Sequence, residues 1–278
     1  MSKSRKNTPR PLIFDDDIQG GDKDKWFNPI IDGDVKGHGL VPRDLNTFPK
    51  EMFDPPSDIK LIPKSDWSQR IKEQARLKAR LSDARGSIPS LDQNGQGFCW
   101  AYSTTSVVTI LRAINNQPYK RLSAHAVACK IKNFRDEGGW CGLSAKFQKE
   151  TGCPTIDQWP EKSMSRANDR PEVWENAALH KVTEDWVDLT RDVYDQNLSF
   201  EQLATCLLIG IPCAVDFSWW SHSVCALDLV EVESGSYGLL ILNSWTDAWS
   251  DRGTGILRGR KALPDSAVAL RVTGGSPL

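Results

Sequence analysis

The sequence predicts an α+β fold in two lobes, a helical lobe followed by an antiparallel β lobe. Apolar residues recur at helical spacing in the first half, most clearly over residues 99–114. The second half holds short strand-like runs separated by turn residues, starting near residue 212. At 278 residues, the chain has room for one two-lobed domain with an extension, or for two small domains.

The first part of the chain predicts an extended arm and a linker helix. Residues 1–60 are rich in Pro, Gly and Asp and show little periodicity, so we expect them to gain order only by lying on another surface. Residues 61–86 form the linker, with a helix from Ser65 to about Arg80 and Ser65 or Asp66 as its N-cap. Trp67, Ile71 and Leu81 should lie on or near one face of this helix.

No calcium site is predicted in the arm. The stretch from Asp32 to Gly37 weakly resembles a calcium-binding loop. However, Lys36 occupies a ligand position, and Arg43 stands where the closing glutamate belongs. We therefore predict no metal ion there.

The helical lobe is expected over about residues 87–185 and the β lobe over about 186–278. Helices are expected at residues 99–114, 123–132, 143–150 and, leading into the β lobe, 200–209. Strands are expected at residues 212–217, 224–232, 237–243, 254–258 and 267–272. A turn at Glu233–Ser236 should fold two of these strands into an antiparallel hairpin that brings His222 near Asn243.

The most informative single position is Cys99, which opens the first apolar helix, six residues after Gln93. The thiolate is the reactive form of cysteine. A helix N-terminus favours it, because unpaired backbone N–H groups and the positive end of the dipole lie beside the sulfur. This position indicates nucleophilic sulfur chemistry, although a free cysteine also commonly packs in a core.

This stretch resembles the active-site signature of papain-like cysteine peptidases of the C1 type. The matching residues are Gln93, Cys99, Trp100, Ala101, Tyr102 and Ser103. Two later segments match in the order that the family requires: His222 at the start of a strand-like run, then Asn243-Ser244-Trp245 with the trailing Trp249 and Gly253. The resemblance spans roughly residues 87–278 and implies a papain-like domain there.

The resemblance implies a thiol-dependent endopeptidase that acts on polypeptides through an acyl-enzyme and needs no cofactor. Cys99 and His222 would form a thiolate–imidazolium pair, and Asn243 would orient the imidazole. The Gln93 side-chain amide and the Cys99 backbone N–H would bind the oxyanion. Trp245 would shield the bond between His222 and Asn243 from solvent.

The resemblance also implies a substrate-binding segment at residues 138–141. Gly138-Gly139-Trp140 is similar to the family's Gly-Gly-aromatic segment, in which the second glycine binds the substrate backbone. Gly139 is the matching position, and Trp140 would form a subsite wall. Cys141 stands where the family often has a proline that shapes the main specificity pocket. These residues and Trp245 are the predicted substrate-binding set.

The sequence departs from the family pattern at several positions. Phe98 replaces a small residue, which could narrow or re-aim the cleft, and Thr246 replaces a glycine. Gln96 and Asp136 stand where the family has a disulfide, so that bond cannot form. His38, His125 and His180 have no comparable setting, and we assign them no role.

Two other functions stay open. The papain-like fold could serve as a structural or interaction component of a larger assembly, with the cleft occupied by its own arm or by a partner. A transglutaminase or acyltransferase would share the thiol–imidazole chemistry. The arm itself could be a removable prosegment, although the family's usual prosegment motif is not evident, or a permanent docking arm that joins the chain to an assembly through residues 1–60.

Composition narrows the partners and the compartment. A net charge of −1 gives no basic field for nucleic acid. No signal-type or membrane-spanning apolar run is present, so we expect no membrane association and a cytoplasmic location. The seven cysteines are odd in number and contain no C-x-x-C pair, which favours a reduced compartment without structural zinc.

Overall fold

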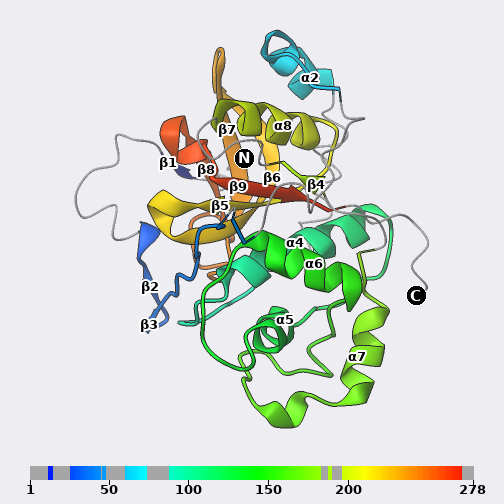
Figure 1. Cartoon of the computed structure of the whole chain (residues 1–278). Helices are drawn as coiled ribbons and strands as arrows, with labels where there is room; N and C mark the ends of the chain where they lie inside the picture. Colours follow the sequence, from blue (N-terminus) through cyan, green and yellow to red (C-terminus); the bar gives the residue numbers. More distant parts are fainter. Residues whose placement is uncertain are drawn as a thin grey trace, which may run out of the picture.

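The computed structural model describes residues 12–14, 26–44, 46–47, 60–73, 88–182, 187–189 and 196–270. The helices between residues 99 and 178 and the sheet lie in different lobes of the molecule (Figure 1), as the sequence predicts. One lobe is built from the helices between residues 99 and 178, and the other is built on a seven-stranded sheet. None of the described helices is both long and apolar enough to cross a membrane.

The helical lobe contains α4 (Cys99–Ile114), α5 (Ala124–Ile131), α6 (Cys141–Glu150) and α7 (Pro171–Ala178). The first three match the predicted helices within two residues at each end. The Ser123 side chain accepts a hydrogen bond from the Ala126 backbone N–H and so caps α5. α7 was not predicted, because it buries only Val173 and Ala177 and its N-cap residue makes no side-chain capping bond.

The β lobe contains one sheet in the order β1-β8-β7-β6-β5-β9-β4. Its strands are β1 (Leu12–Phe14), β4 (Val187–Asp188), β5 (Cys213–Phe217), β6 (His222–Glu233), β7 (Ser236–Leu242), β8 (Thr254–Arg258) and β9 (Ser266–Ala269). All neighbours pair antiparallel except β1 and β8, which are parallel. β4 and β1 were not predicted as strands, because each is only two or three residues long.

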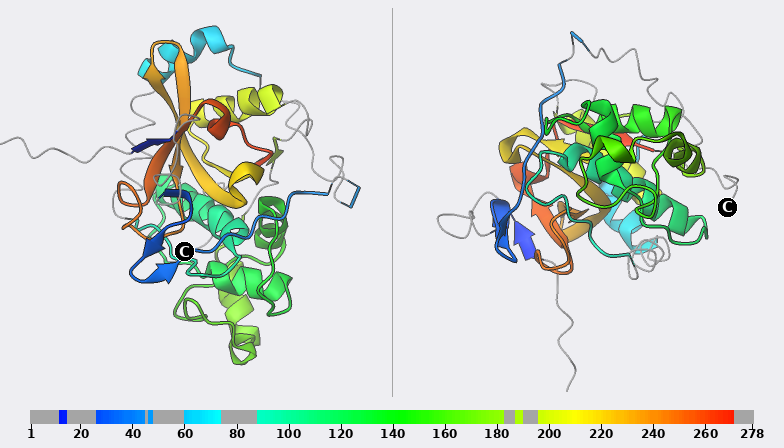
Figure 2. Two further views of the ribbon diagram at one scale, coloured as in Figure 1. Left: turned by 90° about the vertical axis from the view of Figure 1, so that its left-hand side faces the viewer. Right: turned by 90° about the horizontal axis from the view of Figure 1, so that it is seen from below.

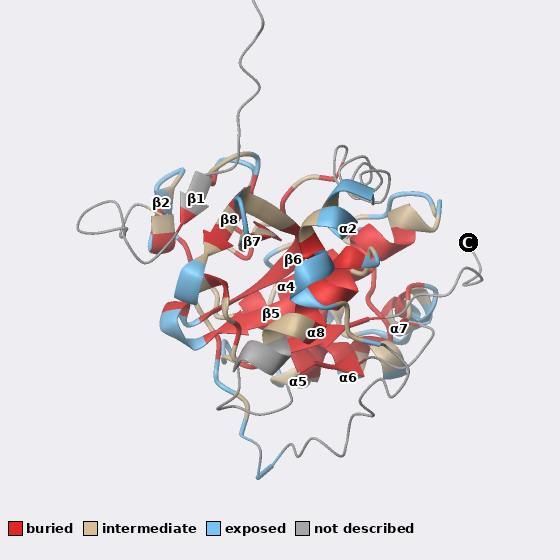
Figure 3. Cartoon of the chain, turned by 90° about the horizontal axis from the view of Figure 1, so that it is seen from above, coloured by how far each residue is buried: buried red, intermediate tan, exposed pale blue. Residues whose placement is uncertain are grey.

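Both faces of the central strands are covered, which explains why β5 and β6 are apolar at nearly every position. On β6, Cys225 and Leu227 face the core that contains α4, whereas Val224 and Ala226 face the core of α8 (Gln196–Leu208). Side chains alternate between the two faces of a strand, so α4 and α8 lie on opposite faces of the sheet. Figure 3 shows α4 and these strands as the buried centre of the molecule.

The linker helix begins differently from the prediction. The 3-10 helix η2 (Lys64–Asp66) precedes α2 (Trp67–Glu73), so Ser65 and Asp66 lie inside a helical turn and neither is the N-cap. Trp67 is buried and donates its indole N–H to the Ile62 carbonyl at 2.9 Å. Leu81 and the predicted end of the helix lie outside the described residues.

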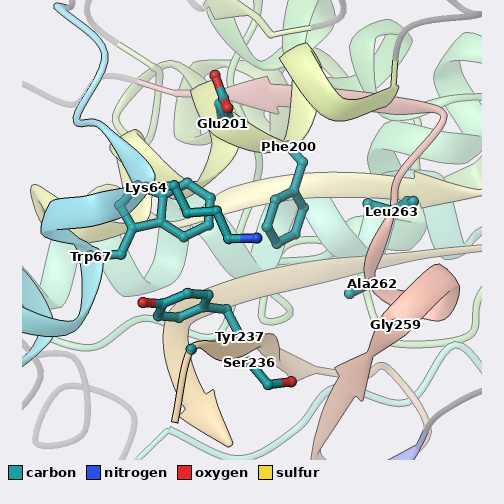
Figure 4. A pocket seen from close by; sticks show the side chains of 10 residues that line it. Lys64, Trp67, Phe200, Glu201, Ser236, Tyr237, Gly259, Ala262 and Leu263 are labelled. Atoms are coloured by element: carbon teal, nitrogen blue, oxygen red, sulfur yellow. The ribbon is translucent and has the colours of Figure 1, made fainter. Parts of the chain in front are cut away.

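The linker helix borders a pocket of about 380 Å³ on the β lobe (Figure 4). Its aromatic walls come from Trp67, Phe200 of α8 and Tyr237 of β7, and Lys64 reaches between them. The Trp67 ring meets the Tyr237 ring edge to face, with the ring centroids 5.1 Å apart. The residues around this pocket hold α2 against the β lobe, and none of the sequence-predicted site residues lines it.

The described parts of the first 60 residues lie on the rest of the chain. β1 extends the sheet by pairing with β8, and Phe14 and Phe27 are buried in the β-lobe core. β2 (Ile30–Ile31) and β3 (Asp34–Val35) form a small hairpin. After it, the chain runs along the boundary between the helices and the sheet, as the blue segment in Figure 2 shows.

Candidate active site

Cys99 lies at the first position of α4 and is fully buried. Burial raises the pKa of its thiol to about 12, although backbone hydrogen bonds from Ser223 and Gly39 act in the opposite direction. Ser223 belongs to β6, and Gly39 belongs to the N-terminal arm. Three segments that are far apart in the sequence therefore meet at this sulfur.

His222 is the first residue of β6 and is also fully buried. Its Nε2 lies 2.7 Å from the Asn243 Oδ1, as the predicted hairpin requires. The Trp245 ring stacks on the imidazole, with centroids 4.4 Å apart and planes at 27°. Within the described residues, His222 Nδ1 has no hydrogen-bond partner. His222 is followed directly by Ser223, whose backbone contacts Cys99, so the predicted cysteine and histidine lie in one buried site.

Gln93 is fixed by hydrogen bonds at both ends of its side-chain amide. Its Oε1 accepts a hydrogen bond from the Ser244 hydroxyl at 2.5 Å. Its Nε2 donates to the backbone carbonyls of Gln96 and Gly37, both at 2.9 Å. The Trp245 indole N–H also donates to the Gly37 carbonyl, at 3.2 Å. A carbonyl group of the arm is therefore bound by the amide that the sequence predicts to bind an oxyanion.

The arm runs through the site as an extended peptide. The Gly139 backbone N–H donates to the Gly39 carbonyl, and the Val41 N–H donates to the Gly139 carbonyl, both at 2.9 Å. These bonds form a parallel bridge between Leu40 and Gly139. On the other side, the Gly39 and Leu40 N–H groups donate to the Ser221 carbonyl at 3.2 and 3.1 Å. Gly139, the predicted substrate-backbone residue, thus binds a polypeptide backbone in this structure.

Two arm glycines allow this close approach. A Cβ atom on Gly39 would lie 2.0 Å from the Gly97 carbonyl oxygen. A Cβ atom on Gly37 would lie 2.3 Å from the Gln96 carbonyl oxygen. Gly138 is equally tight, since its Cβ would lie 2.5 Å from the Gly39 oxygen. No residue with a side chain fits at these positions, so the arm and the walls of the cleft are closely complementary.

Ion pairs anchor the arm segment at both ends. Lys36 is buried, and its Nζ lies 3.1 Å from Asp92, which also pairs with Lys162 at 2.7 Å. At the other end, the Arg43 guanidinium pairs with the buried Asp188. We call residues 36–43 the cleft segment.

His38 lies inside the site, which corrects the expectation that it has no special setting. Its ring centroid is 5.3 Å from that of His222 and 5.2 Å from that of Trp245. Its Nδ1 lies 2.9 Å from the Trp220 carbonyl oxygen. Burial lowers the pKa of His38, and burial together with the nearby His38 lowers that of His222 well below its ordinary value.

With the arm in place, the electrostatics favour a neutral thiol and a neutral imidazole. The thiolate–imidazolium pair expected from the sequence is disfavoured in this state, because burial removes water from both groups. The cleft segment contributes to this burial, because Gly39 contacts Cys99 and the His38 ring lies beside the His222 ring.

Two of the sequence departures are resolved by the structure. Phe98 does not narrow the cleft, because it is buried in the helical-lobe core with its ring edge to face against His125, centroids 5.2 Å apart. Thr246 has a φ of 65°, the left-handed conformation that favours glycine at this position.

The predicted absence of the family's disulfide is consistent with the local contacts. The seven cysteines, all within the described residues, are buried free thiols. Asp136 instead accepts a hydrogen bond from the Gly97 N–H at 2.8 Å, which ties the loop before Cys99 to the segment ahead of Gly138.

The remaining predicted binding residues occupy the wall beyond Gly139. Trp140 and Cys141 are buried, and the Cys141 N–H donates to Asp216 Oδ2 at 3.1 Å. The Trp140 ring faces Arg43 rather than an open cleft. No group of three metal-binding side chains occurs within the described ranges.

The sequence does not indicate which arm residues enter the cleft or which side chains hold them there. Lys36, His38 and Arg43 lie in a stretch without periodicity, and Asp92 and Asp188 are single acids that no motif marks. The one local signal was the pair Gly37 and Gly39, since closely spaced glycines can mark a close backbone approach. Contacts between segments that are 50 to 180 residues apart leave no other trace in a single sequence.

The chain is similar in sequence to two known proteins. Mexicain of Jacaratia mexicana is 24% identical over 185 residues, which cover 61% of this chain and 82% of mexicain. Cathepsin B-like CP2 of Giardia intestinalis is 33% identical over 82 residues, which cover 28% of this chain and only 27% of that relative. No family model matches the chain.

Solved structures show the same fold. Procathepsin L2 from the Tenebrio molitor larval midgut superposes with a TM-score of 0.60 at 19% identity, covering 85% of this chain and 78% of that one. Xylellain, a cysteine protease from Xylella fastidiosa, gives 0.58 at 16% identity, covering 86% and 97%. Bromelain from Ananas comosus, in complex with E64, gives 0.51 at 15% identity, covering 69% and 97%. In sequence the chain is similar to mexicain and to a cathepsin B-like protein, and it shares the two-lobed α+β fold of papain-like cysteine peptidases of the C1 type.

Proposed function

We propose that this protein is a thiol-dependent endopeptidase in which Cys99 is the nucleophile and His222 the general base and acid. The observation that carries the proposal is the extended peptide bound between Gly139 and Ser221, beside Cys99. A cleft that binds polypeptide backbone next to a helix-terminal thiol has the geometry that peptide cleavage requires.

In the proposed reaction, the Cys99 sulfur attacks the carbonyl carbon of the scissile bond after its proton passes to His222. The oxyanion accepts hydrogen bonds from the Gln93 amide and the Cys99 N–H. His222 then donates its proton to the leaving amine as the C–N bond breaks, which leaves an acyl group on the sulfur. Water, deprotonated by His222, releases this acyl group, while Asn243 keeps the imidazole oriented.

The closed structure corresponds to an inhibited form of this enzyme. The Gln93 side-chain amide already donates a hydrogen bond to the Gly37 carbonyl, and the Gly39 backbone contacts the Cys99 sulfur. A substrate can therefore enter only after the cleft segment has moved away. The cleft segment runs parallel to the stretch of chain around Gly139, with which Leu40 forms a β-bridge. Procathepsin L2, by its name a precursor, is among the structural neighbours, which supports a regulatory role for an N-terminal segment.

Opening is proposed to displace the cleft segment and leave the earlier part of the arm in place. Phe14 and Phe27 are 1% and 2% exposed within the β-lobe core, and the Trp249 and Trp220 indoles donate to the Trp26 and Phe27 carbonyls. Removing a buried phenylalanine from a core typically costs about 3–5 kcal/mol. Loss of the whole arm would therefore damage the domain, which favours a docking arm over a removable prosegment.

The experiment compares the full-length protein with Cys99→Ala and with Cys213→Ala, a buried cysteine of the β lobe that serves as the matched control. Peptide hydrolysis, carried out by the fraction of molecules in which the cleft segment is displaced, should be measurable in wild type and Cys213→Ala and absent in Cys99→Ala. Intact mass after incubation should show no loss of residues 1–35 in any variant. Hydrolysis that persists in Cys99→Ala would refute the proposal.

The scaffold alternative shares one feature with the structure, since it expects the chain's own arm in the cleft. Xylellain is a cysteine protease by its title, and packing alone gives no reason for Gln93, Cys99, His222 and Asn243 to occur together. A transferase would pass the acyl group to an amine, whereas a hydrolase passes it to water. Adding an amine nucleophile to the peptide assay and analysing the products distinguishes transfer from hydrolysis.

A further inference from the structure

A buried, charged pocket lies at the end of the cleft segment, beyond Gly139. The side chains of Arg43 and Asp188 are 3% and 2% exposed and form an ion pair there. The Arg43 Cζ lies 4.8 Å from the centroid of the Trp140 ring. A carboxylate at the edge of a guanidinium and an aromatic ring against its face together recognise arginine through charge, hydrogen bonding and stacking.

The walls of this pocket belong to the domain and not to the arm. Asp188 is on β4, opposite Val268 of β9, and Trp140 immediately precedes α6. A second buried acid, Asp216, lies on β5 opposite Ser266 of β9. The pocket is therefore built from the ends of strands and a helix that do not depend on the cleft segment.

Asp216 and Asp188 both affect the pKa of the Cys141 thiol. Burial raises the pKa of the Cys141 thiol well above its ordinary value, and the charges of Asp216 and Asp188 add to that rise. Two acidic side chains thus lie close to Cys141, and the arm cation Arg43 pairs with one of them, Asp188.

A peptide that replaces the cleft segment would meet this pocket. Arg43 follows Val41 by two residues, and Val41 makes the bridge bond to Gly139. A substrate strand bound at Gly139 thus has a side chain within about two residues of the pocket. When Arg43 leaves, Asp188 loses the ion pair with this guanidinium, and a guanidinium from the substrate can restore that contact.

We infer that Asp188 and Trp140 form a specificity pocket for a basic side chain, arginine above lysine, in the acyl part of the peptide substrate. This inference rests on the proposed peptidase function. Arginine is preferred because its planar guanidinium can lie on the Trp140 ring while it bonds a carboxylate, whereas an ammonium group cannot make both contacts equally well. Arg43 then serves as the chain's own occupant of the pocket in the closed form.

The test uses the full-length Arg43→Ala variant, which vacates the pocket and loosens the cleft segment. Its substrates are fluorogenic peptides with arginine at the second or third residue before the cleaved bond, paired with citrulline peptides of the same shape and no charge. A buried charge pair gives an expected preference of about 30-fold or more in kcat/KM for arginine. Asp188→Asn in the same background should reduce the preference to less than about threefold.

Asp92→Asn in the Arg43→Ala background is the matched control. Asp92 also pairs with an arm cation, Lys36, but at the opposite end of the cleft segment. It should change the opening of the cleft while leaving the ratio between arginine and citrulline peptides intact. An equal effect of Asp92→Asn and Asp188→Asn on both peptides would mean that Asp188 only fastens the arm, and the inference would fail.

Binding separates this inference from the proposed function. Fluorescein-labelled arginine and citrulline peptides are titrated into full-length Cys99→Ala/Arg43→Ala and followed by anisotropy. Tighter arginine binding that depends on Asp188, without hydrolysis by any catalytically intact variant, would support the pocket and contradict the peptidase. Hydrolysis with equal rates and equal binding for both peptides would overturn the pocket alone.

Discussion

Replacing Gly39 by alanine should open the cleft. The new Cβ would lie 2.0, 2.2 and 2.4 Å from the carbonyl O, the carbonyl C and the Cα of Gly97, all of them backbone atoms. Real Cβ contacts are essentially never under 3.0 Å, so the two backbones must separate by about 1 Å. A shift of that size breaks the bonds of Gly39 to Ser221 and Gly139, which measure 3.2 and 2.9 Å.

These terms give the size of the effect. Two backbone hydrogen bonds contribute about 1 kcal/mol each, and overpacking adds about 1–3 kcal/mol. The docked arm should therefore be destabilised by about 3 kcal/mol or more, which raises the open population about 100-fold.

The assay is the rate at which iodoacetamide alkylates Cys99 in the native full-length protein, followed by peptide mapping. Gly95→Ala is the matched control in the same loop region, because its Cβ would meet only the Val35 carbonyl oxygen, at an ordinary 3.5 Å. Gly39→Ala should react about 100-fold faster than wild type, and Gly95→Ala should react like wild type. Equal rates in all three proteins would refute the closed-cleft reasoning.

Three further outcomes follow from the same contacts. In the Gly39→Ala background, Asn243→Ala should lower kcat at least tenfold with little change in KM, because His222 loses its orienting hydrogen bond of 2.7 Å. A change in KM alone would contradict this role of Asn243. Tyr102→Phe should lower the free energy of unfolding by about 1–3 kcal/mol in urea titrations, because the buried Tyr102 hydroxyl lies 2.5 Å from His125 Nδ1. An unchanged urea midpoint would show that this hydrogen bond does not stabilise the fold. Since the pKa values of His38 and His222 are lowered in the docked state, the protein with its arm undocked binds more protons below about pH 6.5, and docking should weaken as the pH falls. Hydrogen exchange of the arm amides, corrected for intrinsic rates, should show less protection at pH 5 than at pH 7, and His38→Gln should remove most of that difference; equal protection at both pH values would contradict the coupling.

Much of the domain could be predicted because its signals are local or sequential. α4 begins at Cys99 and ends at Ile114, where the apolar periodicity stops. The hairpin of β6 and β7 brings His222 to Asn243, because one turn at residues 233–236 fixes the pairing of both strands. The motif residues needed no long-range information.

The path of the arm through the cleft could not be predicted, because its order comes from the surface that it covers. Gly37 and Gly39 are informative only once the facing carbonyls of Gln96 and Gly97 are known. The ion pair of Arg43 with Asp188 joins positions 145 residues apart. Burial also raises the pKa of the Cys99 thiol to about 12, an effect of long-range packing that the local motif does not indicate.

The most direct test of the account is the detection of an acyl group on Cys99. Full-length Gly39→Ala is mixed with a peptide ester, quenched in acid within seconds, and examined by intact mass and peptide mapping. We expect an adduct with the mass of the acyl part, on Cys99, which disappears on further incubation and is absent in Gly39→Ala/Cys99→Ala. An adduct on another residue, or ester cleavage at an equal rate without Cys99, would contradict it.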